Sequence, residues 1–273
     1  MYIKNKYSIK LTLFYSRKYL VFGLVYSFII FLFFRYFSIP LYLPWEPLTL
    51  IGIAVSFYIG FKNNNAYDRT WEARKIWGGI VNDSRSFATN VLSLIQGKNQ
   101  ENIHQKLLYR HIAWLKLLQV QLRMTRSWEA PKQRLDIFFD RPDEEFHEEM
   151  AKRLKHLLCE EDLKKVRLAT NPATQILNSQ FQEIKALKKE GYLNDYSQVH
   201  LTEVLNRFYD GQGKSERIKN FPLPRQYAST SYWLTIIYVT LIPFGFVSKV
   251  QDFPTFYWVS FLLSGLTIWI FLL

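Results

Sequence analysis

Three long apolar runs at the two ends of the chain limit the possible folds more than any other feature of the sequence. Residues 19–39 form one run, interrupted only by Arg35. Its length suits a bilayer crossing, because roughly 20 apolar residues in a helix span ~30 Å of hydrocarbon. Residues 227–247 and 256–273 form two further runs, joined by the short connection SKVQDFPT. The sequence therefore predicts a membrane domain built from both ends of the chain.

The middle of the chain has the opposite composition. Residues 62–225 are rich in Lys, Arg, Glu and Gln, and strand-type alternation is scarce. Apolar residues instead recur at the helical period, which predicts amphipathic helices. We expect four such helices, at residues 102–124, 146–158, 169–190 and 197–209. Gly211 and Gly213 are expected to end the last of them.

The distribution of Lys and Arg predicts the orientation, because positive residues near short loops are retained in the cytoplasm. Basic residues gather in the N-terminal segment and in the middle of the chain. Both termini are therefore predicted to be cytoplasmic, which requires an even number of crossings. Three runs are already counted, and residues 43–61 are the only candidate for a fourth span.

The predicted fold class is therefore an all-α, multi-pass protein of the cell (inner) membrane. Each subunit has four transmembrane helices and a large helical cytoplasmic region. The predicted segments are residues 1–61 (N-terminal cytoplasmic segment and first two transmembrane helices), 62–225 (cytoplasmic region) and 226–273 (last two transmembrane helices).

The predicted span at residues 43–61 carries a column of large apolar side chains. Within LIGIAVSFYIGFKNNNAYDRTWEAR, residues 50–74, the sequence turns from uncharged to charged without a proline to end a helix. Ile53, Phe57 and Phe61 follow one another at intervals of four and share one helix face. They suit the packed core of a four-helix bundle. They also suit stacked apolar rings around an axis shared by several copies, which gate a pore by dewetting.

Polar residues continue the same stripe beyond Phe61. Asn65, Asp68 and Glu72 suit a pore lining that opens into a cytoplasmic vestibule, and they also suit an ordinary solvated helix. The helical period persists as far as Gly97, a plausible C-cap. The stretch therefore predicts one helix of about fifty residues that passes from the membrane into the cytoplasm.

Residues 60–88, GFKNNNAYDRTWEARKIWGGIVNDSRSFA, resemble the signature of the bacterial branch of the bestrophins, a family of pentameric ion channels. The resemblance implies a homopentamer around one central pore. It places Ile53, Phe57 and Phe61 in the narrow apolar neck. It also implies a second constriction at the cytoplasmic end, where the segment YLNDYSQ contributes Tyr196.

The resemblance leaves the sign of the permeant ion open. Animal bestrophins resemble anion channels and bacterial relatives resemble channels for monovalent cations, so the bacterial-type motif with Asp68 and Glu72 favours cations. The net charge of +12 favours the alternative, an anion-selective channel. Animal members hold calcium with an acidic segment after the fourth span, and no such site is expected in a sequence that ends at Leu273.

Other chemistry has little support in the sequence. The spacings of His104 from His111 and of His147 from His156 are not those of a helical metal pair, and lone Cys159 has no evident activating partner. No glycine-rich phosphate loop occurs. We therefore expect no enzyme, no cofactor and no metal site.

The expected partners are permeant monovalent ions, membrane lipid and further copies of the chain. No nucleic-acid recognition motif accompanies the basic charge, which membrane topology and anionic lipid explain. One competing hypothesis is a membrane-anchored scaffold or sensor whose basic helical cytoplasmic domain binds a partner or anionic lipid. A secondary transporter would need internal repeats and broken helices, and neither is visible.

Overall fold

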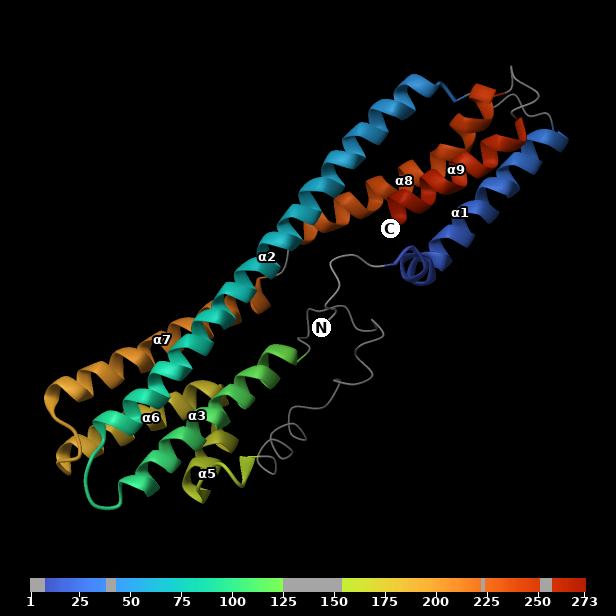
Figure 1. Ribbon diagram of the computed structural model, residues 1–273. Coiled ribbons are helices and arrows are strands. Elements are labelled where there is room, and N and C mark those ends of the chain that lie inside the picture. Colours follow the sequence, from blue (N-terminus) through green and yellow to red (C-terminus); the bar gives the residue numbers. More distant parts are fainter. Residues whose placement is uncertain (1–7, 38–42, 125–153, 222–223, 251–256) are drawn as a thin grey trace. The chain divides into compact units, whose positions relative to one another are not determined.

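The computed structural model describes residues 8–37, 43–124, 154–221, 224–250 and 257–273 (Figure 1). These ranges contain helices joined by turns and no strand, so the predicted all-α class is confirmed. The chain divides into two compact units. Unit 1 comprises Met1–Asp68 and Leu223–Leu273, and unit 2 comprises Arg69–Pro222.

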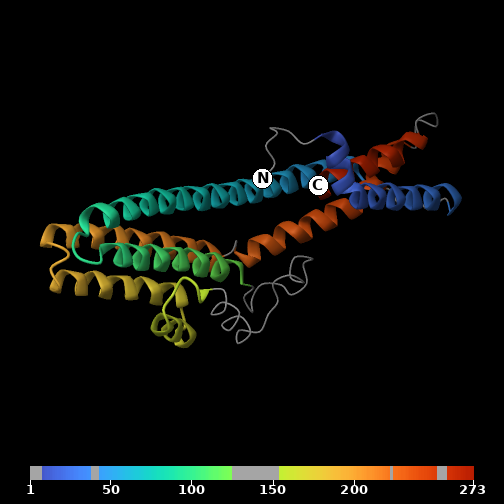
Figure 2. The same cartoon turned by 60° about the horizontal axis from the view of Figure 1, so that its bottom comes forward.

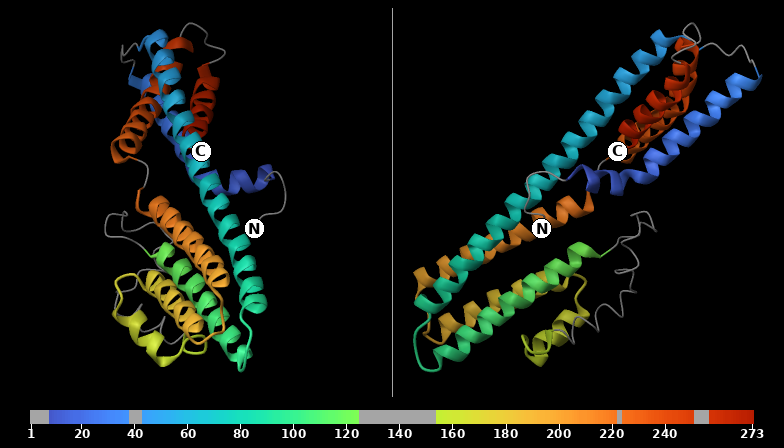
Figure 3. Two further views of the ribbon diagram at one scale, coloured as in Figure 1. Left: turned by 90° about the vertical axis from the view of Figure 1, so that its left-hand side faces the viewer. Right: turned by 45° about the vertical axis from the view of Figure 1, so that its right-hand side comes forward.

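Unit 1 contains the apolar helices α1 (Ile9–Phe37), α8 (Arg225–Val250) and α9 (Tyr257–Leu272), together with the first part of α2 (Trp45–Leu94). In Figure 3, α1 and α8 both run beside α9. Among the described residues, α1 and Gln226–Lys249 are long and apolar enough to cross a membrane, and Trp258–Leu272 is a shorter apolar helix.

Two glycines bring α1 and α9 into close contact. A Cβ atom added to Gly23 would lie 2.7 Å from the carbonyl oxygen of Gly265. Small residues of this kind let helices in membranes approach backbone to backbone. Farther along α1, the buried Phe31 ring packs on Trp258 of α9 with ring centroids 4.9 Å apart. The inner face of α1 is formed by Ser16, Gly23, Ser27, Phe31 and Phe34.

The helix α2 is 50 residues long, so the predicted helix of about fifty residues is confirmed. It ends at Leu94, three residues before the predicted cap Gly97. Its sequence changes character along its length, but no proline occurs after the first turn, and the backbone stays helical.

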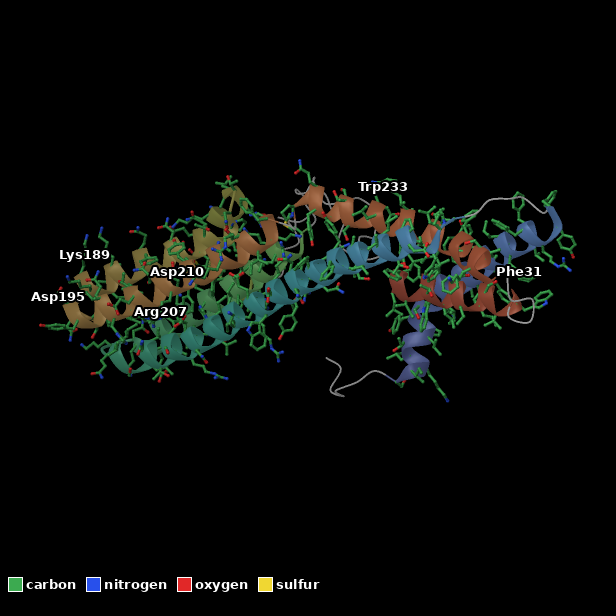
Figure 4. All side chains as sticks on the ribbon, turned by 90° about the horizontal axis from the view of Figure 1, so that it is seen from above. Phe31, Lys189, Asp195, Arg207, Asp210 and Trp233 are labelled. Atoms are coloured by element: carbon green, nitrogen blue, oxygen red, sulfur yellow. The ribbon has the colours of Figure 1, made fainter. Side chains whose placement is uncertain are left out.

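Unit 2 contains the second part of α2 with α3 (Gln100–Arg123), α5 (Glu160–Leu168), α6 (Pro172–Lys189) and α7 (Asp195–Asn220). Figure 2 shows α3, α6 and α7 side by side. Buried apolar residues from all five helices form one continuous core. Figure 4 shows the nitrogen and oxygen atoms of the side chains concentrated on the helices of unit 2.

Local signals explain where α6 and α7 begin. The side chain of Asn171 accepts a hydrogen bond from the Thr174 backbone N–H at 3.0 Å, and Pro172 occupies the first helical position. Asn194 accepts in the same way from the Ser197 N–H at 2.7 Å. Side chains of this type at the N-cap satisfy a backbone donor that the helix leaves unpaired.

The prediction that Gly211 and Gly213 end a helix is wrong, because α7 continues through both to Asn220. A Cβ atom on Gly211 would lie 2.8 Å from Cγ1 of Ile80 on α2. The glycine is therefore a packing residue that lets two helices approach. The short helix α5 was not predicted, and most of the helix predicted at 146–158 lies outside the described residues.

A buried histidine lies among aromatic rings in the core of unit 2. The centroid of the His111 ring is 4.6 Å from that of Phe208 and 5.4 Å from that of Trp114. The Ser84 hydroxyl donates to the carbonyl of Ile80, so the Nε2–H of His111 donates to Ser84 Oγ at 3.0 Å. The Nδ1 atom is then unprotonated, and it has no hydrogen-bond partner among the described residues.

Burial lowers the pKa of His111 from 6.5 to about 4. Below pH 6.5 the unfolded chain therefore binds a proton that the native protein does not bind until about pH 4. We expect His111 to have no effect on the pH dependence of stability above pH 6.5, and to lower the free energy of unfolding by about 3 kcal/mol as the pH falls through this window. Denaturant unfolding of the wild type and of His111→Phe at several pH values measures the difference. Equal pH slopes between pH 4 and 6.5 would contradict the prediction.

Candidate pore-lining surface

The three residues predicted to form the neck lie on the surface of the protomer. Their exposed fractions are 51% for Ile53, 64% for Phe57 and 59% for Phe61. A large apolar side chain normally loses most of its accessible surface when it belongs to a core. These three are therefore not core residues of unit 1 as the structure describes it.

The packing face of α2 in unit 1 is made by other residues. Leu48 and Val55 are 3% and 1% exposed, and Leu48 lies against Gly245 of α8. Gly52, between them, lies against the ring and hydroxyl of Tyr238. The spacing of four and three residues identifies one stripe of the helix.

The neck stripe and the packing stripe lie on opposite sides of α2. At about 100° per residue, the packing stripe centres near 10° from Leu48, and the stripe of Ile53, Phe57 and Phe61 centres near 180°. The helix therefore packs within its own protomer on one side and presents large apolar groups on the other. An exposed apolar surface of this kind is typical of a contact site for another protein or for the membrane.

The exposed column borders a groove of about 660 Å³. Its walls include Tyr238 and Phe271 from the neighbouring helices α8 and α9, and Gly52, Ser56 and Gly60 of α2 also line it. The rings of Phe57 and Phe61 stack with centroids 6.5 Å apart and an angle of 27° between their planes. The two aromatic members of the column therefore stack along the helix.

The polar residues predicted for the vestibule differ in their partners. The Asn65 amide donates to the carbonyl of Phe61 at 3.0 Å, and Asp68 is exposed and has no ion-pair partner among the described residues. Glu72 accepts a hydrogen bond from Nη2 of Arg217 at 2.7 Å. Of the two predicted acidic groups, Asp68 therefore keeps an uncompensated charge, whereas that of Glu72 is partly neutralised.

Sequence reasoning missed a role for Arg69. Its guanidinium donates to the carbonyls of Ile218 at 2.7 Å and of Phe221 at 2.6 Å, at the C-terminal end of α7. Cations at this end of a helix satisfy unpaired carbonyls and interact favourably with the negative end of the helix dipole. The charge next to Asp68 in the sequence is thus used to anchor α7. No local signal predicts this, because the partners are about 150 residues away.

Tyr196, the residue predicted for the cytoplasmic aperture, lies in the first turn of α7 and is 89% exposed. Its neighbour Asp195 pairs with Lys188 of α6, and Figure 4 marks Asp195 and Lys189 where α6 and α7 meet. The α6–α7 turn therefore presents the tyrosine ring to the surroundings.

His104 and Cys159, whose side-chain types can bind a metal or act as a nucleophile, each have a partner within the protein. A ring nitrogen of His104 lies 3.0 Å from the carbonyl of Ile95, and the Cys159 thiol lies 3.4 Å from Oδ2 of Asp162. His147 lies outside the described residues. Within the described ranges, no group of three or more His, Cys, Asp and Glu side chains could hold a metal ion.

Comparison with known proteins gives relatives along most of the chain. The voltage-dependent anion channel-forming protein of Mesorhizobium japonicum is 29% identical over 84% of this chain and 66% of its own length. A protein of the same name from Ralstonia nicotianae is 29% identical over 78% and 63%, and YneE of Escherichia coli K12 is 25% identical over 81% and 67%. The chain thus spans about two thirds of the length of the curated relatives it matches.

Solved structures share the fold. The crystal structure of a bacterial bestrophin homolog from Klebsiella pneumoniae matches with a TM-score of 0.77 and 22% identity, over 93% of this chain and 83% of that one. At that identity, the likeness establishes the fold alone. A sequence model of the family described as bacterial/fungal bestrophin protein matches residues 14–271. The resemblance first noted in residues 60–88 is therefore confirmed, and the chain belongs to the family of bacterial and fungal bestrophin proteins.

Proposed function

We propose that this chain is one subunit of a homopentameric channel of the cell inner membrane that passes monovalent ions. Ile53, Phe57 and Phe61 form the apolar neck, and Tyr196 contributes to a second aperture at the cytoplasmic end. The observation that carries the proposal is the exposed apolar column of α2, which lies opposite the packing face of that helix. Such rings around an axis hold back water and ions until they widen.

The proposed topology follows from the same arrangement. Residues 1–61 and 226–273 supply four transmembrane helices, residues 62–225 form the cytoplasmic region, and both termini are cytoplasmic. Two of the described helices have the length and composition of membrane spans. The continuous α2 then carries the pore lining from the neck at Phe61 to the vestibule at Asn65, Asp68 and Glu72.

We propose selectivity for cations. The carboxylate of Asp68, which has no ion-pair partner in the part of the chain that the structure describes, supports it. A ring of carboxylates raises the local concentration of cations and repels anions. The alternative is an anion channel, which the names of the relatives favour.

Reversal potentials of the purified protein in planar bilayers under asymmetric KCl decide between the two. A cation channel is expected to give a reversal potential close to the equilibrium potential of K⁺. An anion channel is expected to give one close to the equilibrium potential of Cl⁻. In Asp68→Asn we expect the K⁺-to-Cl⁻ permeability ratio to fall several-fold, because each subunit loses one charge from the vestibule. Glu160→Gln, at an exposed position in the first turn of α5, serves as a control with the same change of charge. Equal K⁺-to-Cl⁻ permeability ratios in the wild type and Asp68→Asn would contradict the placement of Asp68 in the ion path.

A membrane-anchored scaffold is the second candidate, favoured by the basic composition of the chain. It predicts that liposomes containing the purified protein release no more ions than empty liposomes do. Ion flux well above that background would exclude it, and background flux for properly inserted protein would exclude the channel.

A further inference from the structure

A groove of about 630 Å³ lies along the outer side of α1. We refer to it as the α1 groove, and it is lined by Arg17, Lys18, Val21, Phe22, Val25, Tyr26 and Ile29. Two basic residues occupy one end of it, and five apolar or aromatic residues follow. A long apolar surface that begins at a pair of cations matches the layout of an anionic lipid.

The groove does not belong to the packing face of α1. Lys18, Phe22, Val25 and Ile29 recur at intervals of four, three and four, which places them on one stripe. At about 100° per residue, this stripe lies roughly 160° from the buried residues of α1. Phe22, Val25 and Ile29 are each more than half exposed, so the protomer itself does not cover them.

The length of the stripe fits one leaflet of a bilayer. Lys18 and Ile29 are eleven residues apart, which is about 17 Å along a helix at 1.5 Å per residue. Half of the ~30 Å hydrocarbon core is about 15 Å. With the two cations at the headgroup level, the apolar part of the groove, from Val21 to Ile29, extends about 12 Å and covers most of the depth of that leaflet.

The start of α1 has the features of a helix at the membrane surface. Figures 1 and 3 show the first turns of α1 turned sharply away from the direction of the rest of the helix. The Ser16 hydroxyl donates to the carbonyl of Thr12 at 2.8 Å, a type of side-chain bond that bends helices. Exposed Phe14 and Tyr15 lie in this part of the chain, and the guanidinium carbon of Arg17 lies 4.4 Å from the centroid of the Phe14 ring. Basic and aromatic residues together are typical of a membrane interface.

We propose that the α1 groove binds an anionic glycerophospholipid of the cytoplasmic leaflet. Its phosphate contacts Arg17 and Lys18, and one acyl chain lies along Phe22, Val25 and Ile29. The Tyr26 hydroxyl donates to the carbonyl of Thr240 on α8 at 3.0 Å, which fixes the wall of the groove against the neighbouring helix. The inference rests on the proposed membrane topology, which puts Arg17 and Lys18 on the cytoplasmic side.

The test is native mass spectrometry of the detergent-solubilised protein, titrated with phosphatidylglycerol or with phosphatidylcholine. We expect phosphatidylglycerol to bind more tightly to the wild type. In Arg17→Gln/Lys18→Gln its affinity should fall about 25-fold, because each basic residue close to an anionic lipid contributes roughly fivefold. Lys10→Gln/Arg35→Gln is the matched control. It removes two charges from the same helix outside the groove and should change the affinity by less than fivefold.

A second variant tests the apolar part with both charges in place. Val25→Trp places a bulky indole ring in the groove at an exposed position. This substitution should weaken phosphatidylglycerol binding at least fivefold. If the double glutamine variant does not fold, Val25→Trp decides alone. Soluble glycerol 3-phosphate carries the phosphate without the acyl chains. It should not displace phosphatidylglycerol when the two are present at equal concentrations.

Equal affinity for the two lipids, unchanged affinity in Val25→Trp, or equal losses in the double variant and its matched control would each overturn the proposal. Equal competition by glycerol 3-phosphate would overturn it as well. Binding is measured without ion flux, so a protein that binds the lipid but does not conduct would refute the proposed channel and leave the lipid site standing.

Discussion

Replacing Phe57 by alanine is expected to raise ion flux on the order of tenfold. The phenyl ring is 64% exposed on the side of α2 opposite its packing face, so its loss leaves the protomer core intact. In the proposed ring of five subunits, the substitution would remove five phenyl groups from one level of the proposed neck and lower the free-energy cost of wetting it. A tenfold increase corresponds to only about 1.4 kcal/mol of barrier. Currents in planar bilayers measure the effect.

Phe33→Ala is the matched control for Phe57→Ala. Phe33 is also a substantially exposed phenylalanine, but it lies on α1, where its ring contacts that of Phe37. We expect the currents of this variant to equal those of the wild type. If Phe57→Ala, Ile53→Ala and Phe61→Ala all gave the same currents as the wild type, the assignment of the neck would be refuted.

Removing the carboxylate of Asp162 is expected to destabilise the protein by about 3–5 kcal/mol. Arg110 on α3 and Asp162 on α5 have side chains that are each 4% exposed. Both Nε and Nη2 of the guanidinium donate to Oδ2 of the aspartate, at 2.9 and 2.7 Å. In Asp162→Ala the buried guanidinium keeps, among the described residues, the longer contacts to Gln180 and Glu183, at 3.3 and 3.4 Å. A buried charge that loses its closest partner carries a penalty of this size.

Thermal unfolding of the detergent-solubilised chain, followed by helical circular dichroism, measures this effect, and we expect the midpoint to fall by on the order of 10 °C. Glu161→Gln, on the same helix, breaks the exposed pair with Lys165 and should leave the midpoint unchanged. The double replacement Arg110→Met/Asp162→Leu removes both charges and should recover most of the lost stability. A midpoint for Asp162→Ala equal to that of Glu161→Gln would contradict the account.

Periodicity and composition predicted the helices well where one residue pattern governs a long segment. The apolar run of α1 and the uninterrupted period of α2 correspond to helices, because nothing in those stretches breaks the backbone pattern. The error at Gly211 has a physical cause. Glycine lowers helix propensity, yet here it makes room for the side chain of Ile80, and tertiary packing overrides propensity.

The stripe of Ile53, Phe57 and Phe61 could be predicted as a shared face because spacing alone determines it. Whether that face is exposed could not be predicted, since exposure depends on where α8 meets α2. The contacts of Gly52 with Tyr238 and of Leu48 with Gly245 join residues almost two hundred positions apart. The pairing of Glu72 with Arg217 escaped prediction for the same reason.

The claim that the exposed stripe of α2 faces a water-filled axis is tested most directly by thiol modification of a conducting channel. In a Cys159→Ala background, cysteine is placed at Phe57 on the exposed stripe or at Val55 on the buried stripe, and a charged methanethiosulfonate reagent is added during recording. The account predicts that current through Phe57→Cys changes rapidly and lastingly, while current through Val55→Cys and through the background protein does not. Unchanged current in Phe57→Cys, with modification confirmed absent by mass spectrometry, would contradict it.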